Sequence, residues 1–228
     1  MKGQPHGFGE KQWPNSEGKV YKGYWQKGSM HGRGELTLCE GEVYLGEFKS
    51  GFPNGRGIRK WKNGDLYEGD YVNGFQQGIG LFVSTVQGWK YQGEWVKGKM
   101  TGKGLCQWAD GTVYQGQWEE CSKEGQGLLR YADGSQYQGD FKDDLPHGFG
   151  RKTLGDGSLY VGQFAQGMFN GQGKFRWADG TEYEGQWKNN EMKGLGTKRL
   201  RNGMVEIQGV FDGNAVNGKG SKKWKRVV

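Results

Sequence analysis

Three histidines and three cysteines are the residues of this 228-residue chain whose types could support chemistry. A nucleophilic or metal site would require His6, His31 or His147 to meet suitable partners. All three instead stand directly before a Gly-x-Gly string, a slot that Asn54 and Thr101 occupy elsewhere. A turn position explains this placement. We therefore expect no Ser-His-Asp or Cys-His arrangement and no enzymatic activity.

The cysteines and the glycine strings exclude other kinds of site. Cys39, Cys106 and Cys121 are odd in number and unrelated in spacing, which fits neither a disulfide framework nor a zinc pattern and is typical of a reducing compartment. The Gly-x-Gly strings lack the following helix that a dinucleotide fingerprint requires. No metal and no cofactor are expected.

The composition favours an ordered fold with a thin core. Glycine contributes 46 residues, hydrophobic residues reach only 33%, and aromatic residues supply 14%. Disordered segments are usually poor in aromatics. No run of about 18 apolar residues is present, and the first residues lack the apolar segment of a signal peptide. We expect a soluble, cytoplasmic protein.

A repeat with a period of 23 residues organises the chain. Its first part is Tyr-x-Gly-x-aromatic, with one spacing of 24 between Tyr67 and Tyr91. Copies occur at Tyr21-Gly23-Trp25, Tyr44-Gly46-Phe48, Tyr67-Gly69-Tyr71, Tyr91-Gly93-Trp95, Tyr114-Gly116-Trp118, Tyr137-Gly139-Phe141, Tyr160-Gly162-Phe164 and Tyr183-Gly185-Trp187. Fixed-period similarity of this kind is the mark of repeat architectures.

Each copy continues with Gly-x-Gly seven residues after the aromatic, then often a large ring, then Asp-Gly or Asn-Gly. Each unit therefore reads as two short strands and two turns. Full repeats begin near residues 21, 44, 67, 91, 114, 137, 160 and 183, after a half repeat over 1–20. A degenerate copy over 207–220, in which Ile207 replaces Tyr, reads as a cap, and 219–228 as a basic tail.

Strand pairing can be predicted from the alternation of side chains. If the aromatic pairs with the first glycine of Gly-x-Gly, Trp25 faces Gly32 and Tyr21 faces Leu36 in one hairpin. Keeping the tyrosines on one face requires a loop with an odd number of residues between repeats, and Ala109-Asp110-Gly111 fits a three-residue loop. The opposite face carries mostly charged and amide residues and is expected to be solvated.

We therefore predict an all-β protein: an elongated, curved and twisted single-sheet solenoid of tandem antiparallel hairpins. Some 18 to 19 strands at roughly 4.8 Å spacing would extend over about 90 Å. Open sheets of more than about 10 strands usually curl. Nearest-neighbour contacts between repeats would stabilise the array.

These motifs resemble the membrane occupation and recognition nexus (MORN) repeat over nearly the whole chain. The resemblance implies a rod-like β-sheet whose concave aromatic groove binds peptide segments or helices. It also implies roles in cytoskeletal, ciliary and membrane-junction proteins, sometimes beside lipid-kinase or methyltransferase domains. The chain opens in the middle of a repeat, so it could be cut from a longer array or be the targeting arm of a larger enzyme.

The aromatic face is the predicted partner-binding groove, because large exposed apolar surfaces usually mark interaction sites. Packing over neighbouring glycines is the alternative for any single ring. The loops that carry Phe52, Phe75 and Met100 are a second candidate for specificity. The predicted groove residues are Tyr21, Trp25, Tyr44, Phe48, Trp61, Tyr67, Tyr71, Tyr91, Trp95, Trp108, Tyr114, Trp118, Tyr131, Tyr137, Phe141, Tyr160, Phe164, Trp177, Tyr183 and Trp187.

The formal net charge of +7 is concentrated from Lys193 onward, where nine Lys or Arg residues accompany two acids. Clusters of this kind can attract a phosphoinositide, another anionic phospholipid or an acidic partner, although a solvated tail is an alternative. No nucleic-acid recognition motif is present. Exposed terminal strands could also pair edge to edge between two copies. The candidate contacts are Lys198, Arg199, Arg201, Lys222, Lys223, Lys225 and Arg226.

Overall fold

The computed structural model describes residues 3–16, 18–38, 41–201 and 205–224, with the backbone alone for 205 and 217–224. Within these residues the chain forms 19 β-strands. They are β1 Gly7–Gln12, β2 Val20–Gln26, β3 Ser29–Thr37, β4 Val43–Lys49, β5 Phe52–Lys60, β6 Leu66–Val72, β7 Phe75–Ser84, β8 Trp89–Val96, β9 Lys99–Gln107, β10 Val113–Glu119, β11 Ser122–Arg130, β12 Gln136–Lys142, β13 Leu145–Thr153, β14 Leu159–Ala165, β15 Met168–Arg176, β16 Glu182–Lys188, β17 Glu191–Arg199, β18 Val205–Asp212 and β19 Ala215–Trp224.

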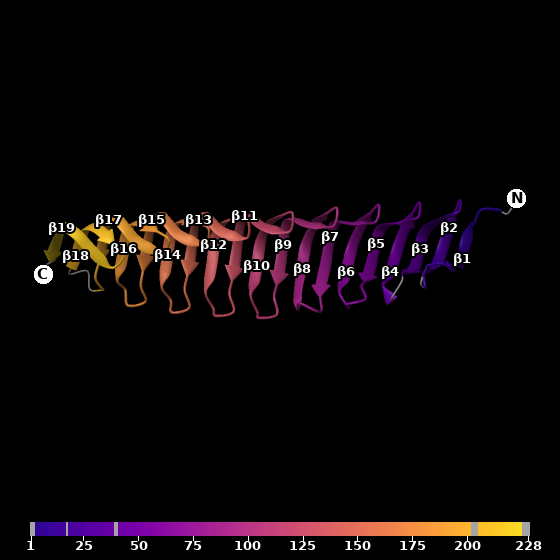
Figure 1. The fold of residues 1–228 in the computed structure, drawn as a ribbon, viewed down its shortest axis with the longest axis horizontal. Helices are drawn as coiled ribbons and strands as arrows, with labels where there is room; N and C mark the ends of the chain where they lie inside the picture. The colour runs from indigo at the N-terminus through magenta and orange to yellow at the C-terminus, as the bar shows by residue number, and fades with distance from the viewer. Residues whose placement is uncertain (1–2, 17, 39–40, 202–204, 225–228) are drawn as a thin grey trace. The chain divides into compact units, whose positions relative to one another are not determined.

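The strands belong to one sheet and follow each other as antiparallel hairpins (Figure 1). The all-β, single-sheet prediction is confirmed. The chain divides into two compact units. The first, the N-terminal unit, holds residues 1–110 and 118–121, and the second, the C-terminal unit, holds 111–117 and 122–228. Short turns join the strands of a hairpin, and longer loops join consecutive hairpins.

The hairpins from β2–β3 to β16–β17 close through a two-residue turn in which both residues have positive φ, as at Lys27 (φ 48°) and Gly28 (φ 80°). This is the turn geometry that suits the right-handed twist of paired strands. It places Trp25 opposite Met30, after which the register shifts before Gly23 meets Gly34. The predicted pairing of Trp25 with Gly32 is therefore wrong, because a β-bulge intervenes. Gly32 instead faces Phe48 of the next repeat.

The two glycines of Gly-x-Gly are required for different reasons. The first lies in the bulge with positive φ, for example 62° at Gly32 and 57° at Gly125, where other L-residues are strained. The second lies beneath a tyrosine ring. A Cβ atom at Gly150 would stand 2.5 Å from the Tyr137 ring, and one at Gly173 would stand 2.3 Å from the hydroxyl of Tyr160. No side chain fits there.

The tyrosine hydroxyl compensates for the bulge. It donates a hydrogen bond to the backbone carbonyl three residues later, which is the carbonyl just before the aromatic, as in Tyr21 to Tyr24 (2.9 Å) and Tyr137 to Asp140 (2.7 Å). The same bond forms from Tyr44, Tyr67, Tyr91, Tyr114, Tyr160 and Tyr183. A buried carbonyl without a partner would cost free energy. Burial raises the pKa of these phenols above its ordinary value.

Edge-on ring contacts connect neighbouring repeats and form the core. Tyr21 meets Trp25 of its own repeat at 5.1 Å and Phe48 of the next at 5.0 Å, both in T-shaped geometry. In the C-terminal unit, Tyr137 meets Phe141 and Phe164 in the same way, at 5.0 and 4.9 Å. This arrangement is the preferred one for aromatic pairs. Each repeat is therefore stabilised by the following one.

The connections between hairpins have the predicted loop geometry. The N–H of Trp61 donates to the carbonyl of Asp65 (2.9 Å), which leaves three residues in the loop, and Gly64 has a φ of 87°. Gly111 of the loop predicted from the sequence has a φ of 90°. The 24-residue spacing arises after β7, which pairs one residue further than its counterparts, Ser84 facing Trp89, around a four-residue loop.

Candidate binding groove

The predicted groove residues lie mainly in the core. The eight motif tyrosines are 0–2% exposed, and the eight motif aromatics that follow them are at most 7% exposed. Trp61, Trp108, Tyr131 and Trp177 are half-buried. The structure therefore corrects the expected exposure of this face. The rings cover each other and their glycines, so little of their surface is left for a partner.

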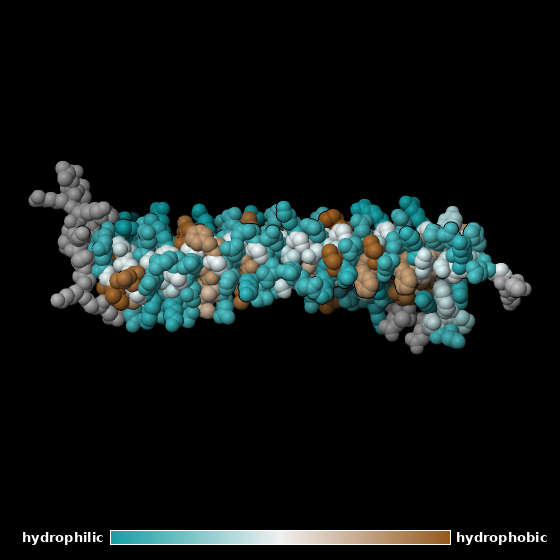
Figure 2. All heavy atoms as spheres, turned by 90° about the horizontal axis from the view of Figure 1, so that it is seen from above, coloured by the Kyte–Doolittle hydropathy of each residue, from teal (hydrophilic) through white to brown (hydrophobic). Residues whose placement is uncertain are grey.

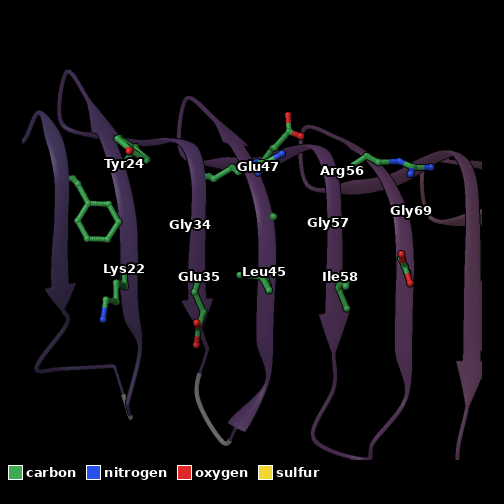
Figure 3. Close-up of a pocket in the computed structure, with 14 residues that line it drawn as sticks. Lys22, Tyr24, Gly34, Glu35, Leu45, Glu47, Arg56, Gly57, Ile58 and Gly69 are labelled. Atoms are coloured by element: carbon green, nitrogen blue, oxygen red, sulfur yellow. The ribbon is translucent and has the colours of Figure 1, made fainter.

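A groove of about 600 Å³ lies on the opposite face of the N-terminal unit. Its floor is the glycine backbone of β3 to β6, at Gly34, Gly46, Gly57 and Gly69. Figure 3 shows two rows of side chains standing on either side of this glycine strip. Tyr24, Glu47 and Arg56 form one row, and Lys22, Glu35, Leu45 and Ile58 form the other. Sequence alternation predicts this as the solvated face, and its apolar members were not anticipated.

An exposed aromatic pair marks one end of the groove. Phe8 of β1 and Tyr24 of β2 face each other across the two strands, with ring centroids 5.5 Å apart and an interplanar angle of 77°. Phe8 is 64% exposed and Tyr24 is 53% exposed. Aromatic side chains are frequent hot spots of interfaces. Unlike the core rings, this pair is available to a partner.

Tyr24 departs from the pattern of the array itself. In five other repeats the residue before the aromatic is an acid or an amide whose side-chain oxygen accepts a backbone N–H from the bulge of the facing strand. Glu94 accepts from Lys103 (2.8 Å) and Gln163 from Gln172 (2.7 Å). Tyr24 has no carboxylate or amide oxygen for this bond, because its side chain ends in a phenol. A position that serves the fold elsewhere is therefore given to an exposed ring here, and comparing the repeats reveals it.

Aliphatic and charged side chains complete the groove. Leu45 and Ile58 face each other across β4 and β5 and are 53% and 37% exposed. Arg56 forms an exposed ion pair with Asp70 (3.4 Å). Among the described residues, Lys22 and Glu35 form no ion pair, although they stand opposite each other. The groove thus offers apolar anchors together with accessible charges of both signs.

The C-terminal unit has a hollow of similar size, about 590 Å³, on the same side of its repeats. Its floor is again glycine, at Gly185, Gly196 and Gly209. The lining side chains are Gln172, Glu184, Gln186, Leu195, Thr197, Arg199 and Gln208, of which Leu195 is the one large apolar member. Glycine floors are thus common to the repeats, whereas the aromatic and aliphatic lining distinguishes the N-terminal groove.

The predicted basic cluster is partly engaged within the protein. Arg199 contacts Glu206 (3.2 Å) and Glu184 (3.5 Å), and the ammonium of Lys198 lies 5.1 Å from the ring of Trp177. Arg201 is exposed. Lys222 and Lys223 belong to β19, whose side chains are not described there, and Lys225 and Arg226 lie outside the described residues.

The described part of the chain contains no group of three or more His, Cys, Asp or Glu residues placed to hold a metal ion. None of its segments is a helix long and apolar enough to cross a membrane.

The model of the MORN repeat matches the sequence nine times, at residues 1–17, 21–43, 44–66, 67–86, 91–113, 114–136, 137–159, 160–182 and 183–205. The chain belongs to the MORN-repeat family. The resemblance suggested by the Tyr-x-Gly-x-aromatic motifs is confirmed. No curated protein matches this MORN-repeat chain in sequence.

Among solved structures, the TCP10 domain of Danio rerio CPAP matches at 12% identity with a TM-score of 0.48, over 91% of this chain and 100% of that one. The same domain with a peptide of Danio rerio STIL gives the same score, over 91% and 98%. The SAS-4 TCP domain of Drosophila melanogaster, with a proline-rich motif of Ana2, gives 14% identity and 0.38, over 84% and 88%. TM-scores below 0.5 establish neither a shared fold nor a shared partner.

Proposed function

We propose that this MORN-repeat protein is a non-enzymatic scaffold that binds a segment of a partner protein in the groove over β1 to β6. The exposed pair of Phe8 and Tyr24 is the observation that carries the proposal. Leu45 and Ile58 supply a second apolar anchor further along the same face. The glycine floor allows a partner backbone to approach the sheet closely. The proposed groove therefore lies on the face opposite the buried aromatic rings.

The charges of the groove favour a partner of mixed character. Lys22, Arg33 and Arg56 stand among Glu35, Glu47 and Glu68 along the walls. Charges at the rim of an interface contribute more to orientation and specificity than to affinity. We propose that a partner places apolar residues over the two anchors and opposite charges between them. Family membership supports locating such a scaffold in a cytoskeletal, ciliary or membrane-associated assembly.

A peptide selected from a random phage-displayed library against the full chain provides the probe. Changing Phe8→Gln and Tyr24→Gln together converts the pair to the Gln172 and Gln186 arrangement that the C-terminal unit already folds with. Affinity should fall at least tenfold, because truncating a hot-spot residue typically costs about 2 kcal/mol or more. Isothermal titration measures the change.

The change Leu195→Gln, on the hollow of the C-terminal unit, is the matched control and should leave the affinity unchanged. A reciprocal change, Gln172→Phe with Gln186→Tyr, should create a second binding site for the same peptide. Unchanged affinity after the first double substitution, or an equal loss with Leu195→Gln, would refute the proposed groove.

A further inference from the structure

A line of side chains crosses the groove face of the N-terminal unit at one level, perpendicular to the strands. Each member faces the next across two neighbouring strands, from β4 to β9. The members in strand order are Leu45, Ile58, Glu68, Leu81, Gln92 and Leu105. The three that follow the second glycine of consecutive repeats, Ile58, Leu81 and Leu105, are all aliphatic. These three residues form the aliphatic row.

The aliphatic row continues the groove along the sheet. Ile58 and Leu105 are 37% and 39% exposed, and Leu81 is half-buried. The glycine floor continues beside the row, where Gly93 faces Gly104. Figure 2 looks onto the hairpin-turn ends of the strands and shows apolar patches set among hydrophilic surface there. The aliphatic row differs from those patches because it recurs once in every repeat.

Hydrogen-bond donors stand on the other side of the glycine floor. Arg33, Arg56 and Lys103 lie between the two glycines of their repeats, and all three are exposed. Figure 3 shows Arg56 and Ile58 on opposite sides of the glycine strip. Guanidinium and ammonium groups only donate hydrogen bonds. An occupant of the groove should therefore present apolar side chains to one wall and carbonyl groups to the other.

The spacing of the aliphatic row selects the conformation of the occupant. Neighbouring strands lie about 4.8 Å apart, so residues two strands apart recur about every 9.6 Å. A polyproline II helix has three residues per turn and advances about 9.3 Å per turn. The two periods differ by about 0.3 Å, which accumulates to only about 0.6 Å over the two repeats from Ile58 to Leu105. Every third side chain of such a helix can therefore meet one member of the row.

Other regular conformations do not match the row. In an extended strand, residues i and i+3 point to opposite faces. In an α-helix, a heptad advances about 10.5 Å and falls out of step by about 0.9 Å in each repeat. A polyproline II helix also has no internal hydrogen bonds, so its carbonyls are available to Arg33, Arg56 and Lys103.

We propose that the segment held in the groove is proline-rich, adopts the polyproline II conformation and carries an apolar residue at every third position. This inference rests on the proposed function and specifies the partner. The segment runs perpendicular to the strands, with its apolar residues on Ile58, Leu81 and Leu105. A proline packs on the rings of Phe8 and Tyr24, as prolines do in aromatic-lined grooves. Each repeat thus recognises three residues of the partner.

Two synthetic peptides test the register with the unchanged full chain. One has five Leu-Pro-Pro triplets, and the other has five Leu-Pro-Pro-Pro quartets and the same number of leucines. Both should give the circular dichroism signal of polyproline II. A spacing of four residues turns successive leucines to different sides of the helix. Isothermal titration should therefore show at least tenfold tighter binding of the triplet peptide.

Variants of the aliphatic row test the site. Leu81→Thr with Leu105→Thr introduces the residue that Thr197 supplies at this position in β17. Affinity for the triplet peptide should fall at least tenfold, and the preference over the quartet peptide should disappear. Phe52→Ser is the matched control, because it changes an exposed hairpin turn to the residue found at Ser29. It should leave the affinity unchanged.

This inference and the proposed function fail separately. Equal affinities for the two peptides, or an unchanged affinity after the substitutions in the aliphatic row, would overturn the inference. A phage-selected peptide that becomes α-helical on binding would also overturn it. In each case, weaker binding of the selected peptide after Phe8→Gln with Tyr24→Gln would still support the groove. If that double substitution had no effect on either peptide, both proposals would be wrong.

Discussion

The two units share one core and differ in their outer surfaces. Both place a buried tyrosine over a pair of facing glycines and satisfy the carbonyl of a bulge with its hydroxyl, as Tyr44 and Tyr160 do. On the outer face, the N-terminal unit presents Phe8, Tyr24, Leu45 and Ile58 around its groove, whereas glutamines dominate the corresponding hollow of the C-terminal unit. The comparison teaches that the residues making the repeat fold and the residues available for recognition are separate sets.

Raising the pH should have the largest effect and should act on both units. Burial, with nearby carboxylates such as Glu94 and Asp70 contributing, raises the pKa of the motif tyrosines in the folded state. The folded pKa then exceeds the value of about 10 in the unfolded chain. Stability is therefore fully present below pH of about 10 and is lost as pH rises through the folded pKa, by at most about 1.4 kcal/mol per tyrosine per pH unit.

We accordingly expect one cooperative alkaline transition in which unfolding and tyrosine ionisation coincide. Circular dichroism, together with phenolate absorbance, follows the two events in one titration. If the phenolate signal of the motif tyrosines developed while the β-sheet signal stayed constant, the rings would be accessible to solvent and the shared core would be wrongly described.

The second largest effect is expected when one methyl group is added beneath a tyrosine, and the loss of unfolding free energy should be similar in the two units. Gly57→Ala and Gly150→Ala place a Cβ atom 2.2 Å from the Tyr44 hydroxyl and 2.5 Å from the Tyr137 ring, respectively. We expect each to lose about 3 kcal/mol or more, since overpacking of this severity forces the ring out of place. The midpoint of urea unfolding measures the loss.

Gly9 is the matched control, because it occupies the same repeat position in β1 without a tyrosine above it. A Cβ atom there would stand 3.6 Å from Trp25, which is an ordinary contact. Gly9→Ala should therefore change stability by less than about 1 kcal/mol. A loss as large as that of Gly150→Ala would show that the glycines are needed for the strand and not for the ring.

The smallest expected effect concerns the hairpin turns and is stabilising. Cys121 is exposed and occupies the second turn position with a φ of 71°, where most of the other turns have glycine. A non-glycine residue in this region costs about 1 kcal/mol. Cys121→Gly should raise the thermal midpoint by a few degrees, whereas Gly98→Ala, at the same position one repeat earlier, should lower it. Differential scanning calorimetry compares them.

Much of the core could be predicted from the sequence because it repeats. The period fixed the hairpins, and the parity of the connecting loops fixed which residues share the tyrosine face. The signal for a two-residue turn stands in another repeat, at Asn73-Gly74, and is absent from Lys27-Gly28. Trp25 was therefore paired with Gly32 in place of Met30. The bulge also explains why the tyrosine hydroxyl has a backbone partner at all.

The candidate groove was harder to predict, since alternation of residues separates two faces without saying which one is covered. Ring upon ring packing buries the aromatic face within a single layer, an outcome that depends on distances of about 5 Å between repeats. A usable signal was present: Tyr24 stands where most repeats have Asp, Glu or Gln. Comparing the copies position by position would have identified it.

Confinement of the bulge and its tyrosine bond to one face has a consequence for how such an array can diversify. A change on the outer rows of one repeat leaves the aromatic contacts of that repeat and its neighbours intact. Successive repeats can therefore acquire different surface residues independently. The cross-strand pairs Phe8 with Tyr24 and Gln172 with Gln186 show this, because they occupy equivalent positions of the repeat with different side chains.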